Sequence, residues 1–136
     1  MKKLNVIIVY NKKEEKILMC KREKEPYKGM FNLVGGKVEN GEEELYAAYR
    51  ELEEETGITK NDIKLTNIMN LDYELKDMEL EVYAGKLNKD VELVEEVNKL
   101  YWIDKKENFF DKEKFAGEGN IGHMIAQADI FKNEIF

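Results

Sequence analysis

Residues 36–58 of this 136-residue chain read GKVENGEEELYAAYRELEEETGI, and this stretch decides how the chain folds. Apolar side chains recur in it at i, i+3, i+4 and i+7, the spacing of one helix face. They are Leu45, Ala48, Tyr49 and Leu52. We therefore predict a helix over Glu42–Thr56, ended by Gly57 at the position where helices commonly take a left-handed glycine.

The carboxylates of this helix break a simple electrostatic rule. Acidic side chains are favourable in the first turn of a helix and unfavourable in the last. Glu53, Glu54 and Glu55 nevertheless crowd the last turn, and Glu51 lies three positions before Glu54. Like charges at such spacings destabilise a helix by roughly 0.2–0.5 kcal/mol per pair. A bound Mg²⁺ or Mn²⁺, which prefers carboxylate oxygens, would compensate; the alternative is a solvated acidic face without a metal.

The residues just before this helix point to phosphate contact. Gly35-Gly36-Lys37 leads from a short predicted strand into a loop. Glycine lets the backbone approach a ligand closely, and Lys37 adds a positive charge. A glycine pair alone is an ordinary turn, so the argument depends on its place beside the acidic helix.

Outside this stretch the chain alternates strand and helix patterns. Runs rich in Val and Ile predict strands, and one more apolar pattern predicts a closing helix. The predicted strands are Lys3–Tyr10, Lys16–Arg22, Met30–Val34, Ile63–Leu75, Met78–Leu87 and Leu100–Ile103, and the closing helix is Ile121–Phe131. The first two strands are expected to form a hairpin, and the glycine pair to end the third. The order predicts one α/β domain over residues 1–136, with a mixed sheet covered by helices.

Composition and charge exclude several classes of protein. The longest apolar run, Val6–Tyr10, is far below the roughly 18 residues of a membrane span, and the apolar stretch after Met1 is too short for a signal peptide. A single cysteine, Cys20, fits a reducing compartment, so we expect a cytoplasmic protein with no membrane partner. The net charge is −7 and only Arg22 and Arg50 are arginines, which argues against binding to a nucleic-acid polymer.

Residues 36–58 also resemble the Nudix box of the Nudix hydrolase family, which includes MutT-like proteins. The box reads G-x5-E-x7-R-E-U-x-E-E-x-G-U, where U is apolar, and every defined position is matched. The matching residues are Gly36, Glu42, Arg50, Glu51, Leu52, Glu54, Glu55, Gly57 and Ile58. The resemblance implies a Nudix-type α/β/α sandwich around a mixed sheet, and a hydrolase that cleaves phosphoric anhydride bonds of small-molecule nucleotides with Mg²⁺ or Mn²⁺. A homodimer is compatible with it, although no stretch marks an interface.

The resemblance also implies roles for individual residues. The implied metal ligands are Glu51, Glu54, Glu55 and the backbone of Gly36. Arg50 is implied to orient the carboxylates through charge-assisted hydrogen bonds, so that Arg50, Glu51 and Glu54 are the predicted catalytic residues. Glu42 is implied to be an auxiliary, partly structural acid, and Lys37 to contact phosphate.

The general base is predicted to be Glu51 or Glu54, because a glutamate must accept the proton of the attacking water. Nudix members differ in which glutamate does so, and some use one outside the box. Here the outside candidates are Glu95, Glu96 and Glu118.

The residues before the box bear on the substrate. Phe31-Asn32 is similar to an aromatic–asparagine pair of Nudix members that clear oxidised purine triphosphates, although Val34 stands where many members that sanitise the nucleotide pool have proline. Asn32 would read a purine edge while Phe31 and Trp102 stack on the base. We therefore expect a nucleoside triphosphate, such as 8-oxo-dGTP, to be cleaved to a monophosphate and pyrophosphate.

Four alternatives stay open at this point. The substrate could be ADP-ribose, a nucleotide sugar or a dinucleotide, or the domain could sense a nucleotide without cleaving it. Phe31-Asn32 could equally be a strand end with a capped turn, and Trp102 a core residue.

Overall fold

A computed structural model describes residues 1–96 and 98–136 of the chain. Its strands and helices follow one another in an order close to the predicted one. In chain order they are β1 (Lys2–Tyr10), β2 (Lys16–Lys21), β3 (Phe31–Lys37), α1 (Glu44–Thr56), β4 (Thr66–Tyr73), the 3₁₀ turn η1 (Glu74–Lys76), β5 (Met78–Lys86), β6 (Leu100–Asp104), α2 (Asn120–Ile130) and α3 (Lys132–Ile135).

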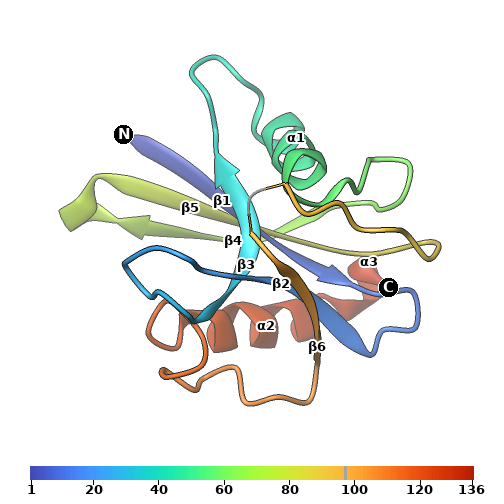
Figure 1. The fold of residues 1–136 in the computed structure, drawn as a ribbon. Coiled ribbons are helices and arrows are strands. Elements are labelled where there is room, and N and C mark those ends of the chain that lie inside the picture. Colours follow the sequence, from blue (N-terminus) through green and yellow to red (C-terminus); the bar gives the residue numbers. More distant parts are fainter. Residues whose placement is uncertain (97) are drawn as a thin grey trace.

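The strands form one mixed sheet in the order β4-β5-β1-β3-β2-β6. β1 and β5 run parallel over their full lengths, and the remaining neighbours are antiparallel. α1 covers one face of the sheet, and α2 with α3 covers the other (Figure 1). The expected α/β/α sandwich around a mixed sheet is confirmed.

The core has two apolar layers, one on each face of the sheet. In β1, Ile7 and Val9 face α1, whereas Ile8 and Tyr10 face α2. A central strand that is buried on both faces needs a continuous apolar run, which explains the run Val6–Tyr10.

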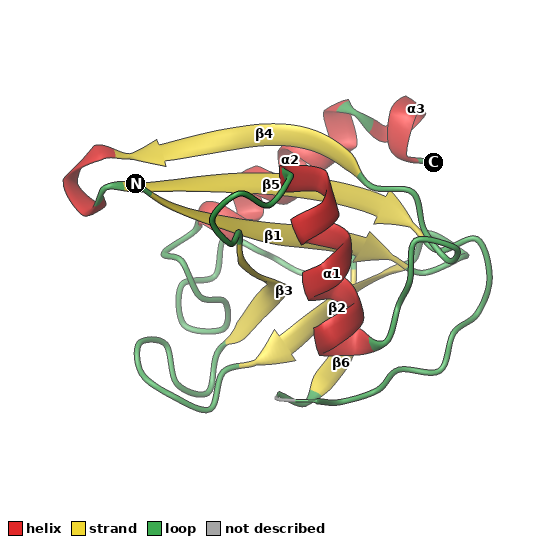
Figure 2. Ribbon diagram, turned by 90° about the horizontal axis from the view of Figure 1, so that it is seen from above, coloured by secondary structure: helices red, strands yellow, loops and turns green. Residues whose placement is uncertain are grey.

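Helix α1 lies across the sheet over the strands that carry the glycine pair and its neighbours (Figure 2). Its buried face includes Ala48 and Leu52, as predicted, but Leu45 is 37% exposed and lies outside the core. Ala47 and Thr56 are buried in its place. The apolar face is therefore rotated relative to the stripe expected from the sequence.

The start of α1 also differs from the prediction. The helix begins at Glu44 rather than Glu42, because Glu43 caps it: the Glu43 carboxylate accepts hydrogen bonds from the backbone N–H of Leu45 (3.1 Å) and Tyr46 (3.0 Å). At the other end Gly57 is left-handed, with φ 80°, and its N–H donates to the Glu53 carbonyl. The predicted C-terminal glycine is confirmed.

Two expectations about the first strands were wrong in part. The glycine pair does not end β3, which continues to Lys37 because β1 pairs alongside it, Val6 with Gly35 and Asn5 with Gly36. The hairpin between β1 and β2 is restricted to the pairing of Tyr10 with Ile17, because β3 lies between the two strands over the rest of their lengths.

The later elements also have shorter or shifted bounds. β4 covers only the middle of the predicted strand Ile63–Leu75, since Ile63 makes an isolated bridge with Leu87 and Leu75 lies in η1. The predicted closing helix is present as α2, followed by the short α3. Among the helices of the described residues, none has both the length and the apolar character to cross a membrane.

Candidate functional site

The glycine pair of β3 lies directly under the acidic side of α1. The Gly35 N–H donates a hydrogen bond to the Glu55 carboxylate, at 3.3 Å. At Gly36, a Cβ would overlap the carboxyl group of Glu51. The absence of a side chain at Gly36 therefore lets the Glu51 carboxylate approach the backbone of β3.

Arg50 holds the surrounding carboxylates together. Its Nε and Nη2 donate to the two oxygens of Glu42, at 2.6 and 2.9 Å, and its Nη1 donates to Glu51 and Glu54, both at 3.1 Å. Nη2 also donates to the Lys37 carbonyl at 2.9 Å. These charge-assisted bonds raise the pKa of Arg50 and lower that of Glu42. The loop from β3 and the last turns of α1 are thus tied to one guanidinium group.

The protonation of Glu55 depends strongly on its surroundings. Burial against the sheet raises the pKa of Glu55 to about 7, opposed by the Gly35 N–H and reinforced by the charges of Glu51 and Glu54. A charge placed at such a site needs a positive partner. A divalent cation beside Glu55 would supply one.

The donor set fits a hard divalent cation in kind but is not assembled around one point. Within the described part of the chain, no three His, Cys, Asp or Glu side chains are grouped closely enough to hold a metal ion. Glu54 is 59% exposed and, like Glu51, is drawn to Arg50. The fit therefore rests on the carboxylate chemistry, on the buried Glu55 and on the space at Gly36, and binding would require Glu51 and Glu54 to turn from Arg50.

The three residues predicted to contact the nucleobase do not share one face of the sheet. Phe31 belongs to the α2 layer, where its ring meets the edge of Tyr101 with centroids 5.3 Å apart. Asn32, the next residue, pairs with Cys20 on the α1-facing side. The side-chain Oδ1 of Asn32 accepts from the Leu33 N–H at 2.9 Å. Successive strand residues point to opposite faces, so Phe31 and Asn32 cannot hold one base between them.

Trp102 and Lys37 are found in different settings. Trp102 lies on β6 opposite Leu18 and packs half-buried against the α1-facing core. Lys37 ends β3 next to the Arg50 cluster, with an exposed side chain. The backbone carbonyl of Lys37 is therefore beside the carboxylates of the box, whereas its side chain follows Leu4 toward the α2-facing side. Trp102 is on the same face as Asn32, two strands further along the sheet.

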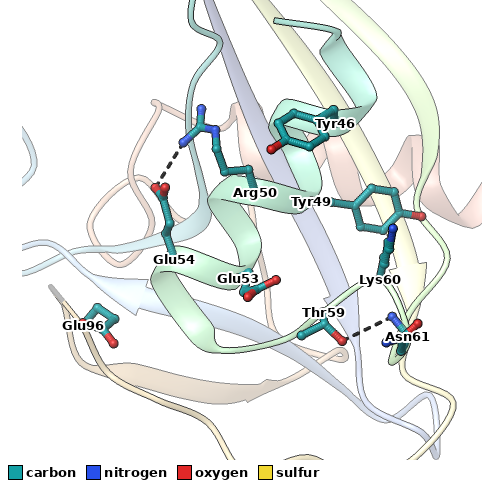
Figure 3. A pocket seen from close by; sticks show the side chains of 9 residues that line it. All are labelled: Tyr46, Tyr49, Arg50, Glu53, Glu54, Thr59, Lys60, Asn61 and Glu96. Carbon is teal, nitrogen blue, oxygen red and sulfur yellow. Dashed lines mark hydrogen bonds and ion pairs between the residues drawn. The ribbon is translucent and has the colours of Figure 1, made fainter.

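A cleft of about 850 Å³ runs along the outer side of α1 (Figure 3). Its lining combines residues of α1 with residues of the loops that follow α1 and precede β6. They are Tyr46, Tyr49, Arg50, Glu53, Glu54, Thr59, Lys60, Asn61 and Glu96. The cleft shares Arg50 and Glu54 with the box, and Glu96 joins its lining from the loop that precedes β6 (Figure 3).

The three glutamates outside the box occupy different places. The loop before β6 is held to the end of α1 by a hydrogen bond from the Val94 N–H to the Thr56 carbonyl, at 2.9 Å, and this brings Glu96 into the cleft. The Glu95 carboxylate instead accepts from the Leu100 N–H at 2.8 Å. Glu118 precedes α2, the helix on the opposite face of the sheet.

Two polar residues under α1 were not singled out by the sequence analysis. Asn5 and Glu81 lie side by side on β1 and β5, 2% and 1% exposed. The side-chain Oδ1 of Asn5 accepts from the Gly36 N–H at 2.9 Å. For Asn5 the sequence offered one indication. It is a polar residue at the start of an apolar strand, and such a residue needs hydrogen-bond partners when it is buried.

Comparisons with known proteins agree with this geometry. The model of the NUDIX domain matches residues 1–121. Two curated relatives are ADP-ribose pyrophosphatases: that of Methanocaldococcus jannaschii is 52% identical over 46 residues, and that of Bacillus subtilis 48% identical over 56 residues. These matches cover 34% and 40% of this chain but only 27% and 29% of the relatives, so the chain is matched to less than a third of their length.

A solved structure agrees over the whole domain. A C. elegans Ap4A hydrolase, solved as a binary complex, superposes with a TM-score of 0.77 over 99% of this chain and 100% of its own, at 21% identity. At that identity the likeness establishes the fold alone. Together with the match of the family model over residues 1–121, it leads to one conclusion: the chain belongs to the NUDIX domain family.

Proposed function

We propose that the chain is a divalent-cation-dependent hydrolase of the phosphoric anhydride bond in a nucleoside diphosphate derivative such as ADP-ribose. The observation that supports hydrolysis is the approach of two carboxylates to one glycine pair: Glu55 accepts from the Gly35 N–H, and Glu51 fills the space beside Gly36. Such a cradle of backbone and carboxylate oxygens suits a hard cation together with the phosphates that complete its shell.

In this proposal the cation is Mg²⁺ or Mn²⁺, and its ligands are Glu51, Glu54, Glu55 and the backbone carbonyl of Gly36. When bound, it would neutralise phosphate charge and lower the pKa of an attacking water. Arg50 donates to Glu51 and Glu54 in the free chain. Both carboxylates would turn from it toward the cation, while Arg50 would stay bound to Glu42 beside them. Lys37, at the exposed end of β3, would add positive charge for a phosphate.

A glutamate must take the proton from the attacking water while the water oxygen bonds to phosphorus and the bond to the leaving phosphate breaks. Glu51 and Glu54 are the candidates within the box. Among the outside candidates, Glu96 is favoured because it shares the cleft with Glu54, whereas Glu95 is bound to the Leu100 N–H and Glu118 belongs to the opposite layer.

The proposed substrate differs from the one expected from the sequence. The expectation of an oxidised purine triphosphate depended on Phe31 and Asn32 acting on one base, and these residues face opposite sides of the sheet. Two ADP-ribose pyrophosphatases contain segments that are 52% and 48% identical to this chain. We therefore put ADP-ribose first and nucleoside triphosphates second.

The test is a hydrolysis screen of the purified chain against ADP-ribose, nucleotide sugars, dinucleotides, and normal and oxidised nucleoside triphosphates. We expect Mg²⁺-dependent release of AMP and ribose 5-phosphate from ADP-ribose, with no turnover by Glu54→Gln. Release of pyrophosphate from a triphosphate would instead support the nucleoside triphosphate expected from the sequence. Saturable binding of a nucleotide without turnover would contradict catalysis and indicate a nucleotide sensor.

A further inference from the structure

Asn5 lies at the centre of a row of residues taken from three neighbouring strands. β1 runs between β3 and β5 under α1 (Figure 2), and the pairing places Asn5 between Gly36 and Glu81. Its carbonyl oxygen accepts the Gly36 N–H at 2.9 Å. Asn5 therefore binds, from β1, the same peptide that the Glu51 carboxylate approaches from α1.

The amide nitrogen of Asn5 is in an unusual state. It is buried, and it has no hydrogen-bond partner among the residues that the structure describes. Buried donors are nearly always paired, so an unpaired one in a native protein calls for a physical reason. If Asn5 served only to join β1 to β3, burial of its amide nitrogen without a partner would lower stability with no compensating gain.

The acidic groups on the β5 side of Asn5 already have partners. The Tyr83 hydroxyl donates to Glu81 at 3.1 Å, and Glu81 is hydrogen-bonded to Glu44. Glu44 in turn accepts from the Lys3 ammonium at 2.7 Å. On the β3 side, the Glu51 carboxylate lies beside Gly36, and its Oε1 accepts from Arg50. Its Oε2 has no donor among the residues that the structure describes.

We propose that Asn5 is a positioning residue of the metal site: its carbonyl oxygen fixes the Gly36 peptide, and its amide nitrogen donates to an oxygen of the loaded site, that of the Glu51 carboxylate or of a bound water. This inference rests on the proposed function. The free chain then keeps one donor unsatisfied, and binding of the cation satisfies it. Hydrogen bonds of this kind behind metal ligands commonly change metal affinity or activity by about 10- to 100-fold.

The test compares Asn5→Leu with Val9→Ala. Leucine has the same branched shape as asparagine, although it is larger, and it has no polar atom, so it removes both proposed hydrogen bonds. Val9 is fully buried on the same strand and the same α1-facing side, but it pairs with Gly85, away from the glycine pair. Val9→Ala therefore controls for lost packing in β1.

The main readout is Mn²⁺ affinity measured by electron paramagnetic resonance without substrate. We expect about 10- to 100-fold weaker binding for Asn5→Leu and wild-type binding for Val9→Ala, even where both lower the melting temperature. In the wild type, the side-chain amide resonances of Asn5, assigned by their loss in Asn5→Leu, should shift on titration with Mg²⁺. Wild-type Mn²⁺ affinity in Asn5→Leu, or Asn5 amide resonances that do not shift on titration with Mg²⁺, would overturn the proposal.

A variant that does not fold and a wild type that binds no metal have different meanings. If Asn5→Leu does not fold, Asn5→Ser is compared with Val9→Ala in the same way, and affinity equal to the control again overturns the role. If the wild-type chain itself binds neither Mn²⁺ nor Mg²⁺, the proposed function fails, whatever Asn5 does.

Discussion

At the scale of single residues, the two adjacent glycines of β3 do different work. Gly35 has φ 148°, a region that side chains rarely adopt, and a Cβ there would overlap the backbone carbonyl of Asn5. At Gly36 a Cβ would meet only the carboxyl end of Glu51, a flexible side chain. Gly35 is thus needed by the backbone, and Gly36 by the position of a carboxylate.

This difference predicts opposite results for two alanine substitutions. Gly35→Ala should lower the free energy of unfolding by about 1–3 kcal/mol, because neither the backbone conformation nor the neighbouring strand can adjust easily. Gly36→Ala should leave the melting temperature nearly unchanged but reduce ADP-ribose turnover by about 10- to 100-fold, because it displaces Glu51. Thermal melts and initial rates at saturating Mg²⁺ check both; a stable Gly35→Ala with a strongly destabilised Gly36→Ala would contradict the assignment.

Arg50 predicts a loss that depends on geometry rather than on charge. Its planar fork reaches Glu42 through two nitrogens and donates to Glu51 and Glu54 from a third, which a single ammonium group cannot reproduce. Arg50→Lys should therefore lower turnover by about 10- to 100-fold while the net charge stays the same.

The matched control is the only other arginine, Arg22, whose guanidinium donates to the Pro26 carbonyl in an exposed loop. Arg22→Lys should keep wild-type rates and wild-type Mg²⁺ dependence. Equal rates for Arg50→Lys and the wild type would show that charge alone suffices at position 50.

At the scale of elements, the sequence predicts α1 well and its surroundings less well. Periodicity and Gly57 predict the body and end of the helix, but a run of three glutamates does not reveal which one caps it, and Glu43 does. The continuation of β3 through Gly35-Gly36 was not predicted, because it depends on pairing with β1, 30 residues earlier in the chain. Local patterns carry no information on such pairing.

The contact between α1 and β5 predicts how stability depends on pH. Burial, and then the hydrogen bond with Glu44, raise the pKa of Glu81 to about 7. A carboxyl whose pKa is raised by folding stabilises the folded state below its usual pKa of 4.5, and this contribution is lost as pH rises through 7. Glu81→Gln keeps a neutral hydrogen-bonding group and removes the titration.

Melting temperatures between pH 5 and pH 8, without divalent cation, should therefore fall less steeply in Glu81→Gln than in the wild type. Some slope should remain in both proteins, because the pKa of Glu55 is also raised to about 7. Identical slopes in the two proteins would contradict a protonated Glu81 in the folded state.

At the scale of the whole molecule, the candidate site combines parts that are far apart in sequence. The box predicts the carboxylates of α1 and the glycine of β3 because they are close in the chain. The row of Asn5, Gly36 and Glu81 needs the order and register of three strands, which no local pattern supplies. The opposite orientation of Phe31 and Asn32 was within reach of the sequence, since adjacent residues of a predicted strand face opposite sides.

The layered architecture finally predicts which outside glutamate takes part in catalysis. Glu96 lies in the cleft that contains Glu54, and it makes no hydrogen bond or ion pair within residues 1–96 and 98–136. Glu51 and Glu54 both accept hydrogen bonds from Arg50 and are proposed metal ligands, and a cation bound to a carboxylate lowers its basicity. A general base is therefore better supplied by a carboxylate outside the ligand set, and Glu96 is one in this proposal.

Glu96→Gln should therefore lower kcat by about 10²- to 10⁴-fold, with Mn²⁺ affinity unchanged. Glu118→Gln is the control, because it changes the same chemical group next to α2, across the sheet from the cleft, and should keep wild-type rates. A wild-type rate in Glu96→Gln would return the base to Glu51 or Glu54. Weakened Mn²⁺ binding in Glu96→Gln would instead make this residue a further ligand, since a base that only accepts a proton leaves metal affinity unaltered.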